Sequence, residues 1–344
     1  MNSATTVLQR ATEVTAYAAI APHAPLEAWS YEPGPLRADE VDIAVTHCGV
    51  CHTDIHLIDN DLGASTYPLV PGHEVVGTVT AIGAAVTTIA PGQRVGAGWQ
   101  RGACNECEWC RQGLENLCAA SRPTCLAGYG GFAQSVRVDS RFAIPIPDAL
   151  ESVVAAPLLC GGITVYAPLC RLVHPGTRVG VVGIGGLGHL AVQFARAMGA
   201  EVFAFSTSPD KLEAARQFGA HHCFISADRD AMKRANRRLD VLISTAAADL
   251  DWAFWLGTLR PNGRFCLLGA SPGPISLPTL PMIFGQFSFS ASIIGPPRQM
   301  EEMLRFAALH GVRPAVEVLP FKQVNEALER VRTNQARFRM VLES

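Results

Sequence analysis

The sequence predicts an α/β protein in which a Rossmann-type, doubly wound parallel sheet is joined to a β-rich domain. Beyond residue 155, strand-like and helix-like patterns alternate: RVGVVGIG (178–185) is an apolar run that ends in glycines, and LGHLAVQFARAMG follows with helical spacing. EVFAFST, LDVLISTA and GRFCLLGA are further strand-like runs. Such βαβ alternation favours a parallel sheet with right-handed crossovers.

The part before residue 155 has a different character. Short β-like segments (TAYAAIA, VDIAVTHCGV, VVGTVTAIG and FAQSVRV) are broken by glycine and proline. This pattern predicts an irregular β domain with functional loops. A length of 344 residues suits two domains. Near the end, MEEMLRFAALHG and VNEALERVR are amphipathic helices that either complete the sheet domain or return the chain to the first domain.

Composition excludes several classes of function. A net charge of −2 argues against a nucleic-acid-binding or membrane-binding surface. We find no unbroken apolar run near the roughly 20 residues that cross a bilayer, and MNSATTVLQRATEV lacks the pattern of a signal peptide. A cytoplasmic location is therefore expected. In that compartment, 11 cysteines indicate metal ligands or catalytic groups rather than disulfides.

A glycine loop follows the first strand of the alternating region. Gly183-Ile184-Gly185-Gly186-Leu187-Gly188 fits G-x-G-x-x-G between a predicted strand and a predicted helix, the context that distinguishes a dinucleotide site from a structural turn. Gly183 permits the tight turn, Gly185 admits a pyrophosphate, and Gly188 allows helix and strand to pack closely. The helix amino terminus then offers free N–H groups to the phosphates.

The end of the next strand favours NADP over NAD. NAD sites usually carry an acidic residue there, which binds the ribose hydroxyl. Here the strand ends in Ser206-Thr207-Ser208, with Lys211 just beyond, and these groups suit a 2′-phosphate. Asp210 is the rival carboxylate, but it follows Pro209 and is expected to begin a helix.

Four cysteines are closely spaced in the β-rich part. Cys104, Cys107, Cys110 and Cys118 form C-x2-C-x2-C-x7-C. Four thiolates at this spacing can surround one zinc ion with no open position, so the site is predicted to be structural. An iron–sulfur cluster is the alternative, because it too is held by four cysteines.

A second metal site can be assembled from three separate segments. CGVCHTDIH (48–56) offers Cys48 or Cys51, GHE offers His73 with Glu74 beside it, and PLLCGG offers Cys160. Two thiolates and one imidazole leave a fourth position open on zinc, which is the arrangement of a catalytic site. Glu74 is expected to ligate transiently or to support the ligands. Spacing alone leaves the choice between Cys48 and Cys51 open.

These motifs, in this order, resemble the zinc-dependent medium-chain alcohol dehydrogenases, in particular the cinnamyl alcohol dehydrogenase-like branch. CGVCHTDIH, PGHEVVG, the four-cysteine run, PLLCGGITVY, VGIGGLGH and FSTSPDK all match. The resemblance implies a GroES-like catalytic domain over 1–157, a Rossmann domain over 158–292 and a return to the catalytic domain over 293–344. It also implies a homodimer that reduces aldehydes with NADPH.

The resemblance assigns roles to particular residues. Cys51 is the zinc ligand with His73 and Cys160, while Cys48 is structural. Thr53 and His56 match the proton relay, and Asp61 matches a supporting carboxylate. Histidine suits a relay because its charge changes near neutral pH. The remaining matches are the cofactor loop (Gly183, Gly185, Gly186, Gly188) and the 2′-phosphate pocket (Ser206, Thr207, Ser208, Lys211).

One departure concerns the segment between Cys118 and Gly130, which is shorter than in several relatives of this family and contains an additional Cys125, interpreted as structural.

Two other functions compete with the main hypothesis. One is an NAD-dependent polyol or amino-alcohol dehydrogenase, against which the strand end and PLLCGGITVY argue. The other is a non-catalytic NADPH-binding redox sensor, against which the intact ligand and relay residues argue.

Overall fold

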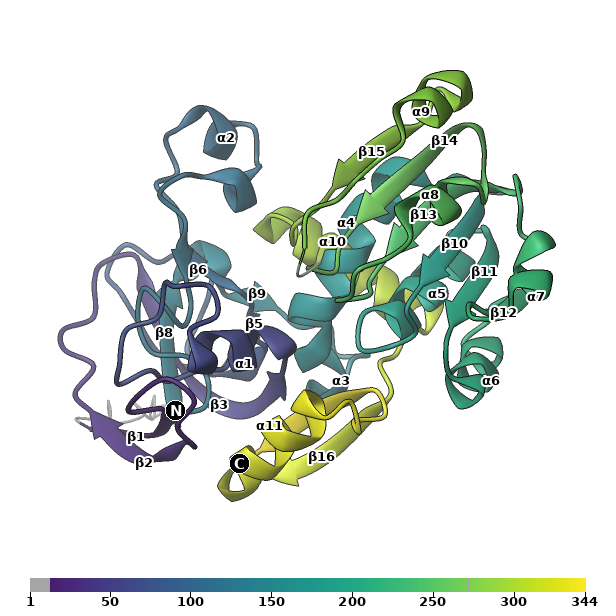
Figure 1. Cartoon of the computed structure of the whole chain (residues 1–344). Helices are drawn as coiled ribbons and strands as arrows, with labels where there is room; N and C mark the ends of the chain where they lie inside the picture. The colour runs from purple at the N-terminus through teal and green to yellow at the C-terminus, as the bar shows by residue number, and fades with distance from the viewer. Residues whose placement is uncertain (1–12, 271–272) are drawn as a thin grey trace. The chain divides into compact units, whose positions relative to one another are not determined.

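Contacts divide the chain into two units in the computed structural model, which describes residues 13–270 and 273–344 (Figure 1). The first unit runs to Cys160 and takes in Pro296–Arg305 and Ala315–Ser344; the second comprises Gly161–Gly295 and Phe306–Pro314. Residues 1–12, which include most of the segment analysed above for a signal peptide, lie outside the described residues.

These boundaries differ from the expected ones in two respects. The divisions fall after residues 160 and 295 rather than 157 and 292, and residues 306–314 group with the second unit rather than returning to the first. The reason for the second difference is aromatic packing. The ring of Phe306 lies 5.4 Å from that of Tyr166 and 6.0 Å from that of Phe194, and both partners belong to the second unit.

A seven-stranded sheet forms the centre of the first unit. Its order is β16-β17-β3-β4-β5-β9, and β8 also pairs with β3. The strands of this sheet are β3 (Glu40–Val50), β4 (Val75–Ile82), β5 (Arg94–Ala97), β8 (Ser135–Asp139), β9 (Ile144–Pro145), β16 (Val316–Pro320) and β17 (Arg339–Glu343). The long β3 is almost entirely buried because β17, β4 and β8 all pair with it. The amphipathic VNEALERVR forms α11 (Val324–Arg332), which packs with this unit.

Smaller elements complete the first unit. They are β1 (Val14–Ala18), β2 (Glu27–Tyr31), α1 (His52–Asp59), β6 (Gln100–Gly102), α2 (Glu108–Arg111), η1 (Glu115–Leu117), β7 (Arg122–Pro123), η2 (Ser140–Phe142), α3 (Ser152–Pro157) and η4 (Phe321–Gln323). Strands β6 and β7 pair with each other as a short two-stranded stem. This stem carries the lobe that contains α2 and η1, which stands out from the rest of the unit in Figure 1.

The second unit is built on a six-stranded sheet of order β12-β11-β10-β13-β14-β15, in which every neighbouring pair is parallel. This is the doubly wound order predicted from the βαβ alternation. The strands are β10 (Arg178–Val182), β11 (Glu201–Ser206), β12 (His222–Ile225), β13 (Leu239–Ser244), β14 (Leu259–Leu267) and β15 (Ser288–Ala291). Apolar runs such as β10 are buried because helices cover both faces of a parallel sheet.

Helices connect these strands and flank the sheet in Figure 1. They are α4 (Ile163–Leu172), α5 (Gly188–Ala197), α6 (Pro209–Gln217), α7 (Arg229–Lys233), α8 (Trp252–Leu256) and α9 (Thr279–Gly285), followed by α10 (Pro297–His310). LGHLAVQFARAMG forms α5 as predicted, and its apolar positions Leu190, Ala191 and Phe194 are buried.

One helical stretch is long and apolar enough to cross a membrane by length and composition only. Ser152–Leu172, which joins α3, the π-helical turn η3 (Leu158–Gly162) and α4, has 21 residues, and its most apolar 18-residue window has a mean hydropathy of 1.8. Of its most apolar window, 78% is buried inside the protein. Core helices of globular proteins have the same length and composition, so this stretch is weak evidence for a membrane span.

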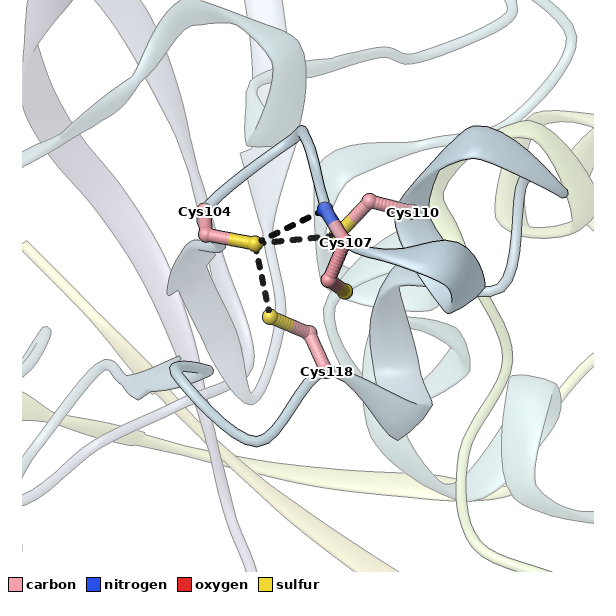
Figure 2. Close-up of side chains that lie close together, drawn as sticks. All are labelled: Cys104, Cys107, Cys110 and Cys118. Carbon is pink, nitrogen blue, oxygen red and sulfur yellow. Dashed lines mark hydrogen bonds between the residues drawn. The ribbon is translucent and has the colours of Figure 1, made fainter.

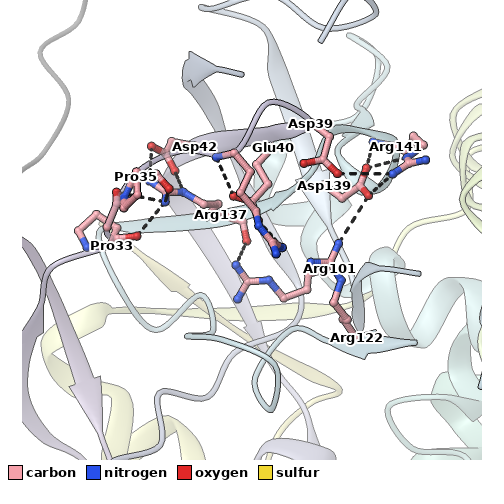
Figure 3. A network of polar contacts seen from close by, with 12 residues as sticks. Pro33, Pro35, Asp39, Glu40, Asp42, Arg101, Arg122, Arg137, Asp139 and Arg141 are labelled. Atoms are coloured by element: carbon pink, nitrogen blue, oxygen red, sulfur yellow. Dashed lines mark hydrogen bonds and ion pairs between the residues drawn. The ribbon is translucent and has the colours of Figure 1, made fainter. Parts of the chain in front are cut away.

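A network of arginines and carboxylates supports β8 and the stem (Figure 3). Arg137 of β8 binds Asp42 of β3 through Nε at 2.6 Å and Nη2 at 3.0 Å, and it also donates to the carbonyl of Pro33 at 2.8 Å. From the stem, Arg101 donates to the backbone carbonyl of Arg137, and Arg122 lies 3.6 Å from Asp139. The stem is therefore fastened to the main sheet from both of its strands.

Candidate zinc and cofactor sites

The junction of β3 and α1 positions Cys51. This residue directly follows the last residue of the strand and precedes the first residue of the helix, with extended backbone angles of φ −116° and ψ 155°. Asp54, in the first turn of α1, accepts a hydrogen bond from the Cys51 N–H at 2.9 Å. The helix start therefore fixes the backbone of Cys51. Thr53 Oγ1 lies 3.7 Å from Cys51 Sγ.

The same Asp54 orients His73. Its Oδ1 lies 2.8 Å from His73 Nδ1 and accepts a hydrogen bond from the Gly72 N–H at 3.0 Å. Both side chains are buried. With Nδ1 protonated and donating to the carboxylate, Nε2 is the free nitrogen of the ring. Nε2 is buried and has no hydrogen-bond partner in the structure, an arrangement that costs free energy unless another group binds there.

Cys160 completes a cluster around that nitrogen. It lies in the π-helical turn η3, a deviation from regular helix that is frequent at functional sites. Its sulfur is 4.0 Å from that of Cys51, and ligand atoms of Cys51, His73, Glu74 and Cys160 all lie within 4.8 Å of one another. The contact between the two sulfurs lowers the pKa of Cys51 well below its ordinary value and, together with burial, raises the pKa of Cys160.

The cluster fits a zinc ion. Sulfur ligands about 2.3 Å from zinc at tetrahedral angles lie about 3.8 Å apart, close to the separation of Cys51 and Cys160. The unpartnered His73 Nε2 would supply the third ligand, and two thiolates with one imidazole leave one position for a substrate. Cys48 is buried, but its sulfur contacts the Gly49 carbonyl at 3.6 Å and it is not among the clustered ligand atoms. The geometry therefore favours Cys51.

Glu74 lies beside these ligands and is paired with an arginine from the far end of the chain. Arg339, the first residue of β17, donates to Glu74 Oε1, while Glu74 Oε2 is buried without a partner in the structure. Burial raises the pKa of Glu74 to about 7, although the guanidinium of Arg339 opposes the rise. The ion pair holds Glu74 next to the cluster with one oxygen free.

The four cysteines of the lobe converge on one point (Figure 2). Cys104 Sγ lies 3.9 Å from Cys110 Sγ and 3.5 Å from Cys118 Sγ, and all four sulfurs lie within 4.8 Å of one another. None of the 11 cysteines forms a disulfide. Short turns of helix in α2 and η1 direct the sulfurs inward. The donor set fits a closed tetrahedral zinc site with no position for a substrate.

The two expected relay residues, Thr53 and His56, lie on α1, and the supporting carboxylate Asp61 lies just after it. The helix ends at Asn60, whose left-handed φ of 60° turns the chain back so that the Asp61 N–H bonds to the carbonyl of His56 at 3.0 Å. Asp61 Oδ2 then lies 2.7 Å from His56 Nδ1. Thr53 and His56 are three residues apart on the helix and therefore lie on the same side of it. The ring of His52 is 5.7 Å from that of His56.

The glycine loop of the second unit connects β10 to α5. Gly183 has φ +86°, and a Cβ added at Gly188 would lie 1.9 Å from the carbonyl oxygen of Gly183, so strand and helix can approach closely only with glycine there. A Cβ added at Gly185 would meet nothing within 4 Å, which leaves its backbone open to a ligand. Gly186 and Leu187 lead into α5, which begins at Gly188.

The end of β11 contains the expected hydroxyl groups. Ser206 is the last residue of the strand and is buried, and its Oγ accepts the N–H of Ser208 at 3.1 Å. Thr207 is exposed, and Lys211 lies in α6. Asp210 occupies the first turn of α6 after Pro209, as expected for a carboxylate at a helix start. The strand itself therefore ends without an acidic residue.

Four residues near the candidate zinc cluster were not assigned to it from the sequence. Asp54 had a usable signal, because an acidic residue three positions after a helix start commonly bonds back to the backbone. Arg339 had none, since 265 positions separate it from Glu74. The other two are Trp99, whose ring is 5.3 Å from that of His73 at 88°, and Cys125, which clusters with Asp54 and His73 within 4.8 Å.

Comparison with known proteins agrees with this assembly. Residues 37–148 match the family "Alcohol dehydrogenase GroES-like domain", and residues 186–308 match "Zinc-binding dehydrogenase". The aldehyde reductase AdhA of Synechocystis sp. is 44% identical over 330 residues, which cover 96% of this chain and 98% of that protein.

Two solved structures are also similar. A cinnamyl alcohol dehydrogenase from Sorghum bicolor superposes with a TM-score of 0.92 at 38% identity, covering 96% of this chain and 97% of that one. CAD from Helicobacter pylori, solved in complex with NADP(H), gives a TM-score of 0.89 at 29% identity, with 96% and 98% covered. The chain therefore belongs to the zinc-dependent medium-chain alcohol dehydrogenases, in their cinnamyl alcohol dehydrogenase-like branch.

Proposed function

We propose that this protein reduces aldehydes to primary alcohols with NADPH, and catalyses the reverse reaction with NADP, using a zinc ion held by Cys51, His73 and Cys160. The main observation that supports this proposal is that Nε2 of His73 is buried without a hydrogen-bond partner beside two thiol sulfurs. A second zinc ion held by Cys104, Cys107, Cys110 and Cys118 would stabilise the lobe. The first unit is the catalytic domain and the second the NADP-binding domain.

The two cofactors and the protein residues divide the chemistry between them. Zinc would act as a Lewis acid on the substrate oxygen, and NADPH would supply the hydride. Cys51, His73 and Cys160 hold the metal position, and Asp54 keeps the His73 ring in the orientation that presents Nε2. Arg339 keeps Glu74 beside the ligands, where its free Oε2 can replace a ligand during exchange.

Reduction also needs a proton at the substrate oxygen, and the residues of α1 supply it. Thr53, next to Cys51 Sγ, donates a hydrogen bond to the substrate oxygen. His56 stores the proton, with Nδ1 bonded to Asp61 and Nε2 free to exchange. The side chains of His56 and Asp61 are 39% and 49% exposed, so His56 can be reprotonated by solvent.

The cofactor site lies on the second unit. The open backbone at Gly185 and the amino terminus of α5 accept the pyrophosphate. Ser206, Thr207, Ser208 and Lys211 receive the 2′-phosphate, since hydroxyls and an ammonium group stand where an NAD site places a carboxylate. NADP(H) in the Helicobacter pylori relative supports this choice.

The protein is proposed to form a homodimer through the edge of its parallel sheet. Strand β15 is the end strand and, among the residues that the structure describes, pairs only with β14, so its outer edge is open to pairing with another strand. Leu280, Ile283 and Phe284 of the neighbouring α9 are 63%, 60% and 81% exposed. Exposed apolar side chains beside an open strand edge suit association with a second copy.

A cytoplasmic location is proposed on cysteine chemistry. Eight of the cysteines lie in the two candidate metal clusters or next to them, and none of these eight forms a disulfide. Thiols of this kind persist in a reducing compartment.

One experiment tests the activity. Purified protein is analysed for metal and then assayed with aliphatic, terpenoid and aromatic aldehydes, using NADPH and NADH in parallel. Two zinc ions per chain and NADPH-dependent reduction are expected. NAD-dependent oxidation of polyols without aldehyde reduction would favour the polyol dehydrogenase alternative. NADPH binding with no turnover of any substrate would favour the redox sensor.

A further inference from the structure

The stem of the four-cysteine lobe ends beside the proposed catalytic zinc ligands. Trp99 precedes β6 and Cys125 follows β7, so the two residues lie at the same end of the stem. Thr124 joins the two chains there: its N–H bonds to the Trp99 carbonyl at 2.8 Å, and its buried hydroxyl donates to the Gly98 carbonyl at 2.7 Å. The end of the stem is therefore closed by hydrogen bonds.

Both residues at this end contact the imidazole of His73. The indole of Trp99 meets the ring edge-on, with 5.3 Å between ring centroids and 88° between planes. The ligand atoms of Asp54, His73 and Cys125 lie within 4.8 Å of one another, so the Cys125 sulfur lies beside the His73 side chain. Cys125 is only 2% exposed, so the contact excludes water.

Hydrogen bonds and an ion pair hold the stem in place. Arg101 of β6 and Arg122 of β7 each bind β8 of the main sheet, as Figure 3 shows. Gln100 of β6 reaches toward the lobe and donates to the carbonyl of Glu115 at 2.9 Å and to Ser121 Oγ at 2.7 Å. Because both strands are fastened, Cys125 cannot move away from His73 without breaking several hydrogen bonds.

We propose that Cys125 is a positioning residue for the zinc ligand His73, presented to it by the stem of the four-cysteine lobe. The proposal rests on the catalytic zinc of the proposed function. Asp54 holds Nδ1 of His73 through one hydrogen bond, and a single hydrogen bond still allows the imidazole ring to tilt. The Cys125 thiol and the Trp99 edge restrict that tilt and keep Nε2 directed at Cys51 and Cys160. Outer partners of this kind commonly change metal affinity by 10- to 100-fold.

The test compares Cys125→Ala and Cys125→Ser with the wild type in zinc-loaded protein. A chromogenic chelator follows zinc release, in which the open site and the closed lobe are expected to give separate phases. Cys125→Ala should accelerate the faster phase by about 10-fold, the lower end of the usual range, and leave the slower phase unchanged. It should also shift the visible absorption of protein with cobalt in the open site. Cys125→Ser, which keeps a small polar atom, should restore both readouts.

Matched controls separate positioning from general loosening. Cys266→Ala removes a thiol that is 1% exposed in the second unit and should change neither phase. Thr124→Val should reproduce part of the Cys125→Ala effect, because it frees the end of the stem. Thr258→Val removes another buried hydroxyl, which is bonded to the carbonyl of Trp255 at 2.7 Å in the second unit, and it should not change zinc release.

Different results would distinguish the possible failures. If Cys125→Ala releases both zinc ions at the wild-type rates and its cobalt spectrum is unchanged, the positioning role is overturned and the proposed function stands. Equal acceleration of both phases of zinc release has the same meaning. A wild-type protein with one zinc ion, retained after mutation of Cys51, overturns the proposed function itself.

Discussion

At the scale of single residues, Asp54 organises the cluster to which we assign the catalytic zinc. Its two carboxylate oxygens accept hydrogen bonds from the N–H of Cys51, the N–H of Gly72 and Nδ1 of His73. One buried carboxylate therefore fixes the backbone of one zinc ligand and the ring orientation of another. Glu74 and Arg339 form a second buried charged pair at the same place. Buried charges persist in proteins when they are paired and hydrogen-bonded, as these are.

His56 is the residue whose removal should separate chemistry from cofactor binding. His56→Ala should lower kcat by about 100-fold, the lower end of the range for acid–base groups, because solvent can partly replace an exposed imidazole. NADPH affinity, followed by its fluorescence, should change little. His174→Ala, which removes an exposed histidine of the second unit, is the control. A His56→Ala enzyme with a wild-type pH–rate profile would remove this residue from the mechanism.

Ser206 should control the choice between NADPH and NADH. Ser206→Asp places a carboxylate at the end of β11, where it repels a 2′-phosphate and accepts a hydrogen bond from the ribose hydroxyl. Loss of two charge-assisted hydrogen bonds corresponds to about 100-fold or more in affinity. The ratio of kcat/KM for the two cofactors should therefore reverse. Ser206→Ala, which adds no charge, should lower NADPH use only modestly. Equal use of both cofactors by the wild type would contradict the assignment.

At the scale of elements, short irregular segments position the ligands. Cys51 lies where β3 becomes α1, Cys160 lies in a π-helical turn, and the four lobe cysteines lie around α2 and η1. The lobe has a small apolar core in which Ala103, Cys110, Cys118 and Phe142 are buried. We therefore expect a segment with so little apolar contact to depend on the proposed structural zinc for its order.

Removal of one lobe ligand should therefore affect stability more than chemistry. Cys107→Ser should lose one zinc ion per chain and lower Tm by roughly 5 °C or more. Its kcat, measured at a temperature where the variant stays folded, should change less than that of His56→Ala. The control is Cys223→Ser, a thiol of the second unit outside both clusters. An unchanged melting curve with both zinc ions retained would argue against a structural metal site.

At the scale of the whole molecule, segments distant in sequence build each unit. The first unit is completed by the last strand of the chain, since β17 pairs with β3 and carries Arg339 to Glu74. The second unit takes back residues 306–314 through the packing of Phe306. Its edge strand β15 and the exposed side chains of α9 form the surface to which we assign the dimer contact.

Phe284 should be important for that contact. Phe284→Asp places a charge on a side chain that is 81% exposed in the isolated chain, so the fold should tolerate it. Loss of a buried aromatic at an interface commonly costs about 2 kcal/mol or more, which raises the dimer dissociation constant by about 30-fold. Sedimentation velocity over a concentration series measures the change. Leu309→Asp alters a side chain of α10 that is also 81% exposed and should leave association unchanged. A wild-type protein that is monomeric throughout would contradict the dimer.

The sequence by itself determined the features that depend on neighbouring residues. The parallel sheet followed from apolar runs that alternate with helical spacing, and the glycine loop from its place between β10 and α5. The four-cysteine cluster was evident because its ligands lie within one short segment. Asp210 was expected at the start of a helix because it follows a proline, and α6 begins there. Local periodicity and local chemistry contain this information without any knowledge of the fold.

The tertiary structure alone decided which distant side chains meet. Spacing left Cys48 and Cys51 as alternatives, and the turn of the chain from β3 into α1 places the sulfur of Cys51, not that of Cys48, beside Cys160. Arg339 reaches Glu74 only because β17 pairs with β3, and Cys125 reaches His73 only because the stem folds back on itself. Such contacts follow from the pairing of strands that are about twenty to nearly three hundred residues apart, for which no local pattern in the sequence gives a signal.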